Sequence, residues 1–264
     1  MATADRIDMF IETLRSDVRT GHLDVELGNI LTSSVRQWHR YRDFLRTVLS
    51  RYQEANATFM AAFHRHAEVA KAAAQGRPDS RSRTPDEWQE YPQLERFGCA
   101  VHLEVESFYI FAKVLLDRTA DTFGHYFGEQ WKGMGSTYSK LSRNFERIRN
   151  QRGLALQPTR LARTLPDLLA RIVCVRDVMI EHLSEPRRIP GTAVVDGRAT
   201  ISMILLYPTS GDKGSEQPIS TEALDQLLVG LDQYAADMLE FFEVNSAKSV
   251  FGCKHPALGA SVVE

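Results

Sequence analysis

Residues 38–73 read WHRYRDFLRTVLSRYQEANATFMAAFHRHAEVAKAA, and mostly apolar side chains recur through them every seven residues. Two interleaved sets share this spacing: Trp38, Leu45, Tyr52, Phe59, His66 and Ala73, and Tyr41, Val48, Ala55, Ala62 and Val69. Such sets occupy the a and d positions of successive heptads. A helix of this length is stable only when its seam is covered, so the pattern predicts one continuous helix with a buried seam and an equally long partner.

The expected partner helix begins near Gln93. Residues 75–92 concentrate Pro, Gly, Ser and charge, which predicts an exposed linker rather than a folded element. After this linker, one helical face carries a mainly apolar stripe made of Val101, Val105, Phe108, Ala112, Leu115, Thr119 and Phe123. We expect this stripe to return antiparallel along the first long helix.

The rest of the chain predicts three further helices and one hairpin. The helices are expected over 136–150, 164–183 and 221–244. Within 192–207, Asp196-Gly197 separates two β-branched runs and supplies the positive φ angles of a tight turn, so a two-stranded hairpin is expected there. Residues 246–264 are expected to form a loose C-terminal tail. The predicted fold is a single helical domain over 1–264: an all-α, elongated antiparallel bundle with one long extra helix and a small β-hairpin.

Composition and short motifs exclude several functional classes. Hydrophobic residues make up 43% of the chain and charged residues 25%, as in an ordinary globular protein. The net charge of -2 excludes a uniformly basic nucleic-acid binder, although it permits a local basic patch. The N-terminus has no secretion signal and no apolar run is long enough to cross a membrane, so we expect a cytoplasmic protein. Three scattered cysteines, without CxxC, predict no zinc site, and we expect no cofactor.

One arginine interrupts an apolar stripe and is the most informative position. The stripe comprises Leu165, Leu168, Leu169, Ile172, Met179 and Leu183, and a regular helical period places Arg176 within it. Burying an unpaired charge costs several kcal/mol, so Arg176 is expected to meet a carboxylate, a phosphate or a second subunit. His182 lies in the expected last turn of the same helix.

The string from Arg176 to His182, RDVMIEH, resembles the motif of the HEPN superfamily. The resemblance implies a HEPN-like helical bundle that dimerises at this motif and, where active, a metal-independent ribonuclease of toxin or defence systems. It also implies that Arg176 steadies the scissile phosphate, that His182 transfers protons and that Asp177 orients them. The first long helix and the hairpin are additions to the family's pattern. The alternative is structural: Arg176 pairs with a core carboxylate such as Glu104, and His182 caps the helix.

A basic segment precedes this motif. Residues 132–163 contain eight Lys and Arg residues and a single carboxylate, Glu146. The residues expected to contact an RNA backbone are Lys140, Arg143, Arg147, Arg149 and Arg152. The alternative is a solvated helix face that offsets acidic neighbours.

The leading functional hypothesis is therefore a HEPN-like RNA-binding protein or metal-independent endoribonuclease in defence or stress response. A homodimer is expected, with RNA as the substrate and an antidote or regulatory protein as a further partner to consider. The alternative is a non-catalytic helical scaffold or interaction protein.

Overall fold

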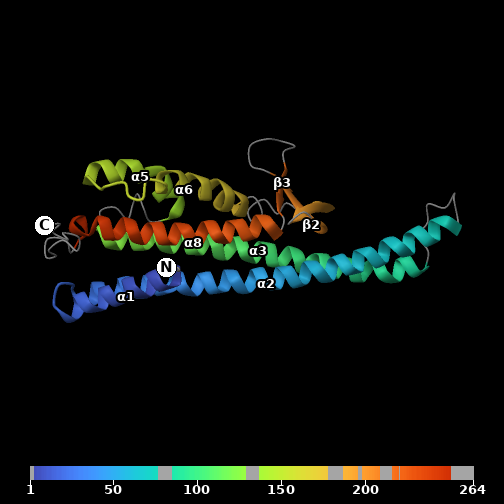
Figure 1. Cartoon of the computed structure of the whole chain (residues 1–264), viewed down its shortest axis with the longest axis horizontal. Helices are drawn as coiled ribbons and strands as arrows, with labels where there is room; N and C mark the ends of the chain where they lie inside the picture. The colour runs from blue at the N-terminus through green and yellow to red at the C-terminus, as the bar shows by residue number, and fades with distance from the viewer. Residues whose placement is uncertain are drawn as a thin grey trace. The chain divides into compact units, whose positions relative to one another are not determined.

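The computed structural model describes residues 3–76, 85–128, 137–177, 187–195, 198–208, 216–219 and 221–250. Side chains are described for 3–68, 92–128, 137–177 and 224–250. The described part is predominantly helical, and its elements in chain order are α1 (Thr3–Arg19), α2 (Val25–Gly76), α3 (Pro85–Phe127), α5 (Tyr138–Arg152), α6 (Leu161–Leu168), the π-helix η2 (Leu169–Cys174), β1 (Arg187–Val195), β2 (Arg198–Pro208), β3 (Glu216–Ile219), α8 (Thr221–Val244) and the 3₁₀ turn η3 (Ser246–Lys248) (Figure 1). None of the helices described is both long and apolar enough to span a membrane.

The chain divides into two compact units; its length is compatible with one domain, as predicted over 1–264, or with two closely packed subdomains. Unit 1 comprises Met1–Leu45, Ile110–Cys174 and Leu227–Glu264, and unit 2 comprises Arg46–Tyr109 and Val175–Gln226. Helices α2, α3 and α8 each contribute residues to both units. Because no linker separates the units along these helices, composition gives no sign of the division.

Helix α2 confirms the continuous helix predicted from the heptads. It runs without a break from Val25 to Gly76 and so extends the predicted range at both ends. Most a and d positions are buried, among them Trp38, Leu45, Val48, Tyr52, Phe59 and Ala62. Tyr41, Ala55 and His66 are half-buried, and the side chains of Val69 and Ala73 lie outside the described residues.

The exposed linker predicted over 75–92 was too long. Helix α2 includes Gln75 and Gly76, α3 already begins at Pro85, and residues 77–84 lie outside the described part. Proline suits the first helical turn because its missing N–H would have no partner there, and Asp86 and Glu87 favour the positive end of the helix dipole. Pro, Asp and Glu are therefore compatible with a loop and equally with the start of a helix.

Antiparallel pairing of α2 with α3 forms the core of unit 1. Trp38 Nε1 donates to Thr122 Oγ1 at 3.1 Å, and Thr122 Oγ1 donates to Ser34 Oγ at 2.9 Å. Further along α2, the Tyr41 ring lies 6.3 Å from that of Phe111. The partner position on α3 falls as the position on α2 rises, which is the antiparallel return that the apolar stripe predicted.

Helix α8 confirms the helix predicted over 221–244 and provides the aromatic centre of unit 1. The ring of Phe242 packs within 6.3 Å, centroid to centroid, of the rings of Phe10, Trp38, Phe123, Tyr126 and Phe127. Rings at such separations in tilted and stacked arrangements add stabilisation beyond their buried area. Phe242 therefore packs α1, α2 and α3 against α8.

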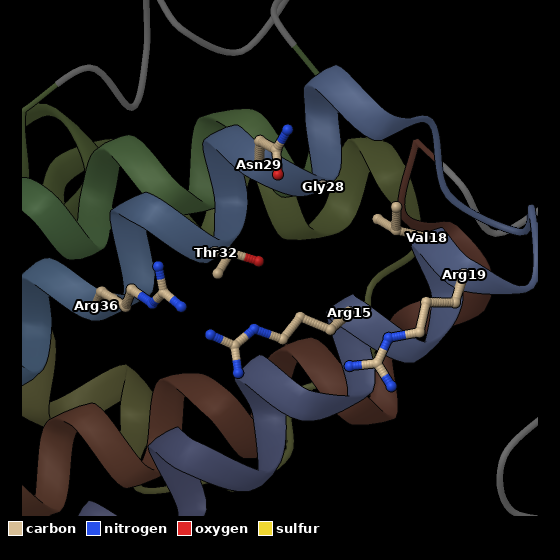
Figure 2. Close-up of a pocket in the computed structure, with 7 residues that line it drawn as sticks. All are labelled: Arg15, Val18, Arg19, Gly28, Asn29, Thr32 and Arg36. Atoms are coloured by element: carbon tan, nitrogen blue, oxygen red, sulfur yellow. The ribbon is translucent and has the colours of Figure 1, made fainter.

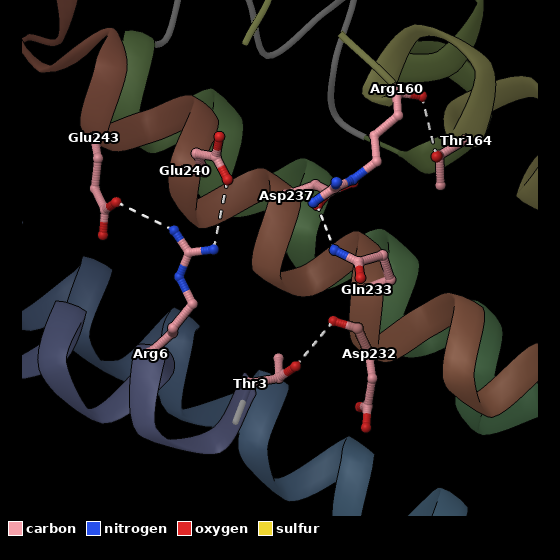
Figure 3. A network of polar contacts seen from close by, with 9 residues as sticks. All are labelled: Thr3, Arg6, Arg160, Thr164, Asp232, Gln233, Asp237, Glu240 and Glu243. Atoms are coloured by element: carbon pink, nitrogen blue, oxygen red, sulfur yellow. Dashed lines mark hydrogen bonds and ion pairs between the residues drawn. The ribbon is translucent and has the colours of Figure 1, made fainter. Parts of the chain in front are cut away.

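The other side of α8 receives arginines from several elements (Figure 3). Arg160 donates from Nε and Nη2 to the two carboxylate oxygens of Asp237 at 2.7 and 2.6 Å. Arg6 of α1 pairs with Glu240 and Glu243, each at 3.5 Å. Arg42 of α2 is buried and donates from Nε to Asp232 at 2.6 Å. The carboxylates of α8 therefore fix α1, α2 and the start of α6 around one helix.

Unit 2 contains the strands. β1 pairs antiparallel with β2, with Thr192 opposite Ile201 and Val195 opposite Arg198. These strands occupy the region 192–207 in which the sequence predicted a hairpin, and they extend beyond it; Asp196 and Gly197 themselves lie outside the described residues. β3 pairs antiparallel with β2 and completes the order β1-β2-β3. The sequence analysis missed this third strand because its four residues are too few to show a period.

The loose tail predicted over 246–264 begins later than expected. Residues 246–248 form η3, Val250 N–H donates to the Tyr126 carbonyl at 3.0 Å, and the Lys248 carbonyl accepts from Arg152. Asn245 anchors the segment by exchanging hydrogen bonds with the Ala155 backbone at 2.7 and 3.0 Å. Residues 251–264 lie outside the described part.

Candidate functional site

Helix α5 carries the basic residues predicted to bind RNA, and its apolar side fixes its orientation. Tyr138, Leu141, Phe145 and Ile148 are buried at helical spacing. Tyr138 is held twice, because its backbone N–H donates to Asp117 Oδ1 at 2.9 Å and its hydroxyl donates to the Leu165 carbonyl at 3.0 Å. The polar side of α5 is consequently held facing away from the core.

Three of the five predicted RNA contacts lie on this outward side. Lys140, Arg143 and Arg147 are exposed and follow one another at spacings of three and four residues, which places them along one helix face. Arg147 also donates to Asn144 Oδ1 at 2.8 Å. Glu146, the single carboxylate of α5, is paired with Arg149. The exposed row of Lys140, Arg143 and Arg147 therefore carries a net positive charge.

The other two predicted contacts are engaged within the chain. Arg149 donates from Nε and Nη2 to Glu146 Oε2 at 2.9 and 2.8 Å. Arg152 donates to the Lys248 carbonyl at 3.2 Å, and its guanidinium lies over the Phe127 ring at 6.0 Å. Partial burial lowers the pKa of Arg152. Sequence spacing alone could not separate Arg152 from the outward row, because its partner Lys248 is distant in sequence, whereas Arg149 pairs with Glu146 at a spacing of three residues on the same helix.

The other cations of residues 132–163 also differ in their surroundings. Arg163 is exposed, Lys132 lies outside the described residues, and Arg160 is paired with the buried Asp237. Arg160 thus stabilises the contact between the start of α6 and α8. The eight cations counted in the sequence do not act as one patch.

The predicted position of Arg176 on a buried stripe was wrong. Leu165, Leu168 and Ile172 are buried as expected, but beyond them the buried positions are Val173 and Val175, and Arg176 is half-buried. The cause is the π-helix over Leu169–Cys174, whose hydrogen bonds run from i to i+5 and add a residue to the turn. A prediction that assumes 3.6 residues per turn throughout therefore assigns residues after this segment to the wrong face of the helix.

Arg176 meets a carboxylate other than the predicted one. Its Nη1 lies 3.2 Å from Asp177 Oδ1, and its side chain is 24% exposed. Glu104, which the structural alternative assigned to Arg176, has an 8% exposed side chain and pairs with Arg51 at 2.5 Å. The Arg176 and Asp177 of the motif are thus adjacent and reachable by solvent, while His182 lies outside the described residues.

Sequence analysis missed other charged residues that the structure brings together. Asp232 and Asp237 of α8 meet arginines about 190 and 77 positions away in sequence. A further three arginines, from α1 and α2, line a common pocket. An Asp within the apolar run AADML of α8 was an available signal for Asp237, but the pocket depends on tertiary contacts that no local pattern shows.

No family model, no curated protein and no solved structure matches this chain. Among the residues described, no group of three or more His, Cys, Asp or Glu side chains is arranged to hold a metal ion.

Proposed function

We propose that this protein binds RNA through the outward face of α5. The observation that carries the proposal is the exposed row of Lys140, Arg143 and Arg147 on a helix whose opposite face is fully packed. Because the helix is already packed, cations on this face contact phosphates without a further cost for ordering the backbone. Each contact also releases counterions from the nucleic acid, which is the main sequence-independent source of affinity.

We further propose that the protein is a HEPN-like, metal-independent endoribonuclease, with a role in defence or stress response. The exposure of Arg176 supports this step, because a guanidinium reachable by solvent can contact a scissile phosphate. In this mechanism the ribose 2′-oxygen attacks phosphorus and the 5′-oxygen leaves. His182 transfers the proton between them, Arg176 stabilises the developing charge, and Asp177 orients the groups. The products are a 2′,3′-cyclic phosphate and a 5′-hydroxyl.

Binding is tested by the salt dependence of affinity for a single-stranded RNA. The double substitution Arg143→Gln and Arg147→Gln should weaken binding and reduce the slope of log K against log salt by about 1.4, since each single-strand phosphate contact contributes about 0.7. Arg65→Gln, at an exposed position of α2, removes a charge elsewhere and serves as the control. Equal affinity and slope in the wild type and the double variant would exclude α5 as the RNA contact.

Cleavage is tested with labelled RNA in buffer containing EDTA. His182→Ala should reduce the cleavage rate by about 10²- to 10⁴-fold while RNA binding is retained, because the substitution removes only proton transfer. DNA should remain intact because it lacks the 2′-hydroxyl nucleophile. Wild-type protein that binds RNA through α5 but leaves a panel of RNAs uncleaved would instead be a non-catalytic scaffold.

A further inference from the structure

A second basic feature lies in unit 1, in a pocket between the end of α1 and the start of α2 (Figure 2). The cavity has a volume of about 330 Å³ and is lined by Arg15, Val18, Arg19, Gly28, Asn29, Thr32 and Arg36. Three of these seven residues are arginines and none is acidic. The pocket thus combines concentrated positive charge with a hydroxyl and an amide.

The pocket is built on a fixed corner of the fold. A Cβ atom added at Gly28 would lie 2.2 Å from Val18 Cγ2, so α1 and α2 approach more closely here than any other residue permits. Arg15 and Arg19 are four residues apart and share a face of α1. Asp24 Oδ1 accepts from the backbone N–H groups of Glu26 and Leu27 at 2.9 and 3.2 Å. The N-terminus of α2 is therefore already capped, and the arginines supply the pocket's positive charge.

Two of the three arginine side chains in the pocket converge. Figure 2 shows the guanidinium groups of Arg15 and Arg36 pointing toward one another, with Thr32 beside them. Glu12 pairs with Arg15 and lies 3.8 Å from Arg19, so one carboxylate offsets part of the charge of three guanidiniums. Like charges close to one cavity repel each other. An anion bound between them is attracted to each guanidinium and so offsets this repulsion.

We propose that this pocket binds the phosphate or diphosphate group of a small phosphorylated ligand, such as a nucleotide. Planar guanidiniums form paired, charge-assisted hydrogen bonds with phosphate oxygens, and the Thr32 hydroxyl and Asn29 amide can donate to the remaining oxygens. The volume lies at the lower end for small-molecule sites, which suits a phosphate-bearing group rather than a large apolar ligand. This site is independent of the RNA-binding face of α5.

Calorimetry and thermal unfolding in phosphate-free buffer test the proposal, with inorganic pyrophosphate, ADP and adenosine as probes. Pyrophosphate and ADP should bind and raise the Tm, and adenosine should do neither. Arg36→Gln, at an exposed position, should weaken pyrophosphate binding at least tenfold while circular dichroism is unchanged. Arg143→Gln on α5 is the matched control and should leave pyrophosphate binding unchanged.

The proposal is overturned if pyrophosphate and ADP do not bind, if Arg36→Gln binds them as tightly as the wild type, or if Arg143→Gln alone removes binding. The terminal phosphate of an RNA is a second source of the same chemistry. A preference for 5′-phosphorylated over 5′-hydroxyl RNA that Arg36→Gln abolishes would assign the pocket to RNA ends. Equal binding of the two RNAs, with ADP binding retained, would assign it to a free small molecule. Loss of RNA binding in the α5 variant with pyrophosphate binding intact distinguishes the two surfaces.

Discussion

Asp237 shows how one residue holds several elements. Its side chain is 0% exposed, yet both carboxylate oxygens are satisfied by Arg160, and Gln233 donates to one of them at 2.7 Å. A buried carboxylate in such a setting is costly to leave unpaired, because the lost attraction is not replaced by water. The side chain of Arg160 is 54% exposed, so the arginine itself is not the buried partner.

Removing Arg160 should therefore be much more harmful than removing an exposed ion pair. We expect Arg160→Ala to lower the free energy of unfolding by about 3 kcal/mol, because the buried carboxylate of Asp237 loses its charged partner and keeps only the amide of Gln233. Glu240→Gln on the same helix, whose 3.5 Å pair with Arg6 is partly exposed, should cost less than about 1 kcal/mol. Urea unfolding measures both. Equal effects would mean that Asp237 is not isolated from water.

Two helical glycines should respond in opposite directions to alanine. Gly28→Ala gains about 1 kcal/mol in helix propensity, but its Cβ overlaps the stiff side chain of Val18, and overpacking costs about 1–3 kcal/mol. At Gly230 the nearest atom to an added Cβ is Leu168 Cδ2 at 3.9 Å, so Gly230→Ala should stabilise by about 0.5–1 kcal/mol. Thermal unfolding tests the difference. Val18→Ala should remove the penalty at Gly28; stabilisation by Gly28→Ala alone would contradict the overlap.

At the scale of elements, periodicity predicted the long helices well. The heptads located α2 and the apolar face located α8, because each pattern repeats over enough turns to dominate local exceptions. The failures came where one local feature had two interpretations. Pro85 marks the start of α3 rather than a loop, and the π-helix after Leu168 changes the phase of the stripe without any sequence signal that a regular period would detect.

The candidate sites were predictable only in part for the same reason. The charge count over 132–163 identified Lys140, Arg143 and Arg147 as candidates, and they lie on the outward face because α5 alone determines that face. The role of Arg152 depends on Lys248, 96 residues away, whereas the pair of Arg149 with Glu146 is local to α5. The arginine pocket likewise joins α1 to α2, so its composition follows from the fold and not from one segment.

The hydrogen bond that anchors α5 through Tyr138 can be tested by substitution. Tyr138→Phe removes the hydroxyl that donates to the Leu165 carbonyl, which keeps the backbone N–H of Leu169 as a donor, so we expect a loss of about 0.5–1.5 kcal/mol. Amide hydrogen exchange should then accelerate in α5 more than in α2. Exchange that rises equally in both helices would show that α5 does not open as a separate element.

Across unit 1, three buried tyrosines make stability depend on alkaline pH. Burial raises the pKa of Tyr126, Tyr138 and Tyr234 above the ordinary value of 10.0. Above pH 10 the folded protein therefore binds more protons than the unfolded chain, and the free energy of unfolding falls as the pH rises further. We expect tyrosinate absorbance from these residues to develop together with loss of helical circular dichroism. Complete ionisation of the chain's eight tyrosines near pH 10 with the helices intact would contradict their burial.

Association concerns the molecule as a whole. We propose a two-fold homodimer in which the segments around Arg176 of the two copies pair, as the resemblance to the HEPN motif implies. Each copy would contribute its own Arg176 and Asp177 to a shared groove, so that RNA meets both. Light scattering at micromolar concentration should give twice the mass of the 29.9 kDa chain. A monomer under these conditions would remove the dimer and the shared groove from the proposal.

The π-helix also means that chain length, and not only side-chain identity, determines which residue meets solvent near the motif. Deleting Ala170 would leave a segment that can close as ordinary α-helix and would keep the residues after it in their present phase, because the π-turn holds one residue more than an α-turn. Arg176 would then keep the half-buried place that it has now. A single-residue deletion within the π-helix should therefore preserve any chemistry that needs an accessible Arg176, as substitution of the exposed Ala170 would.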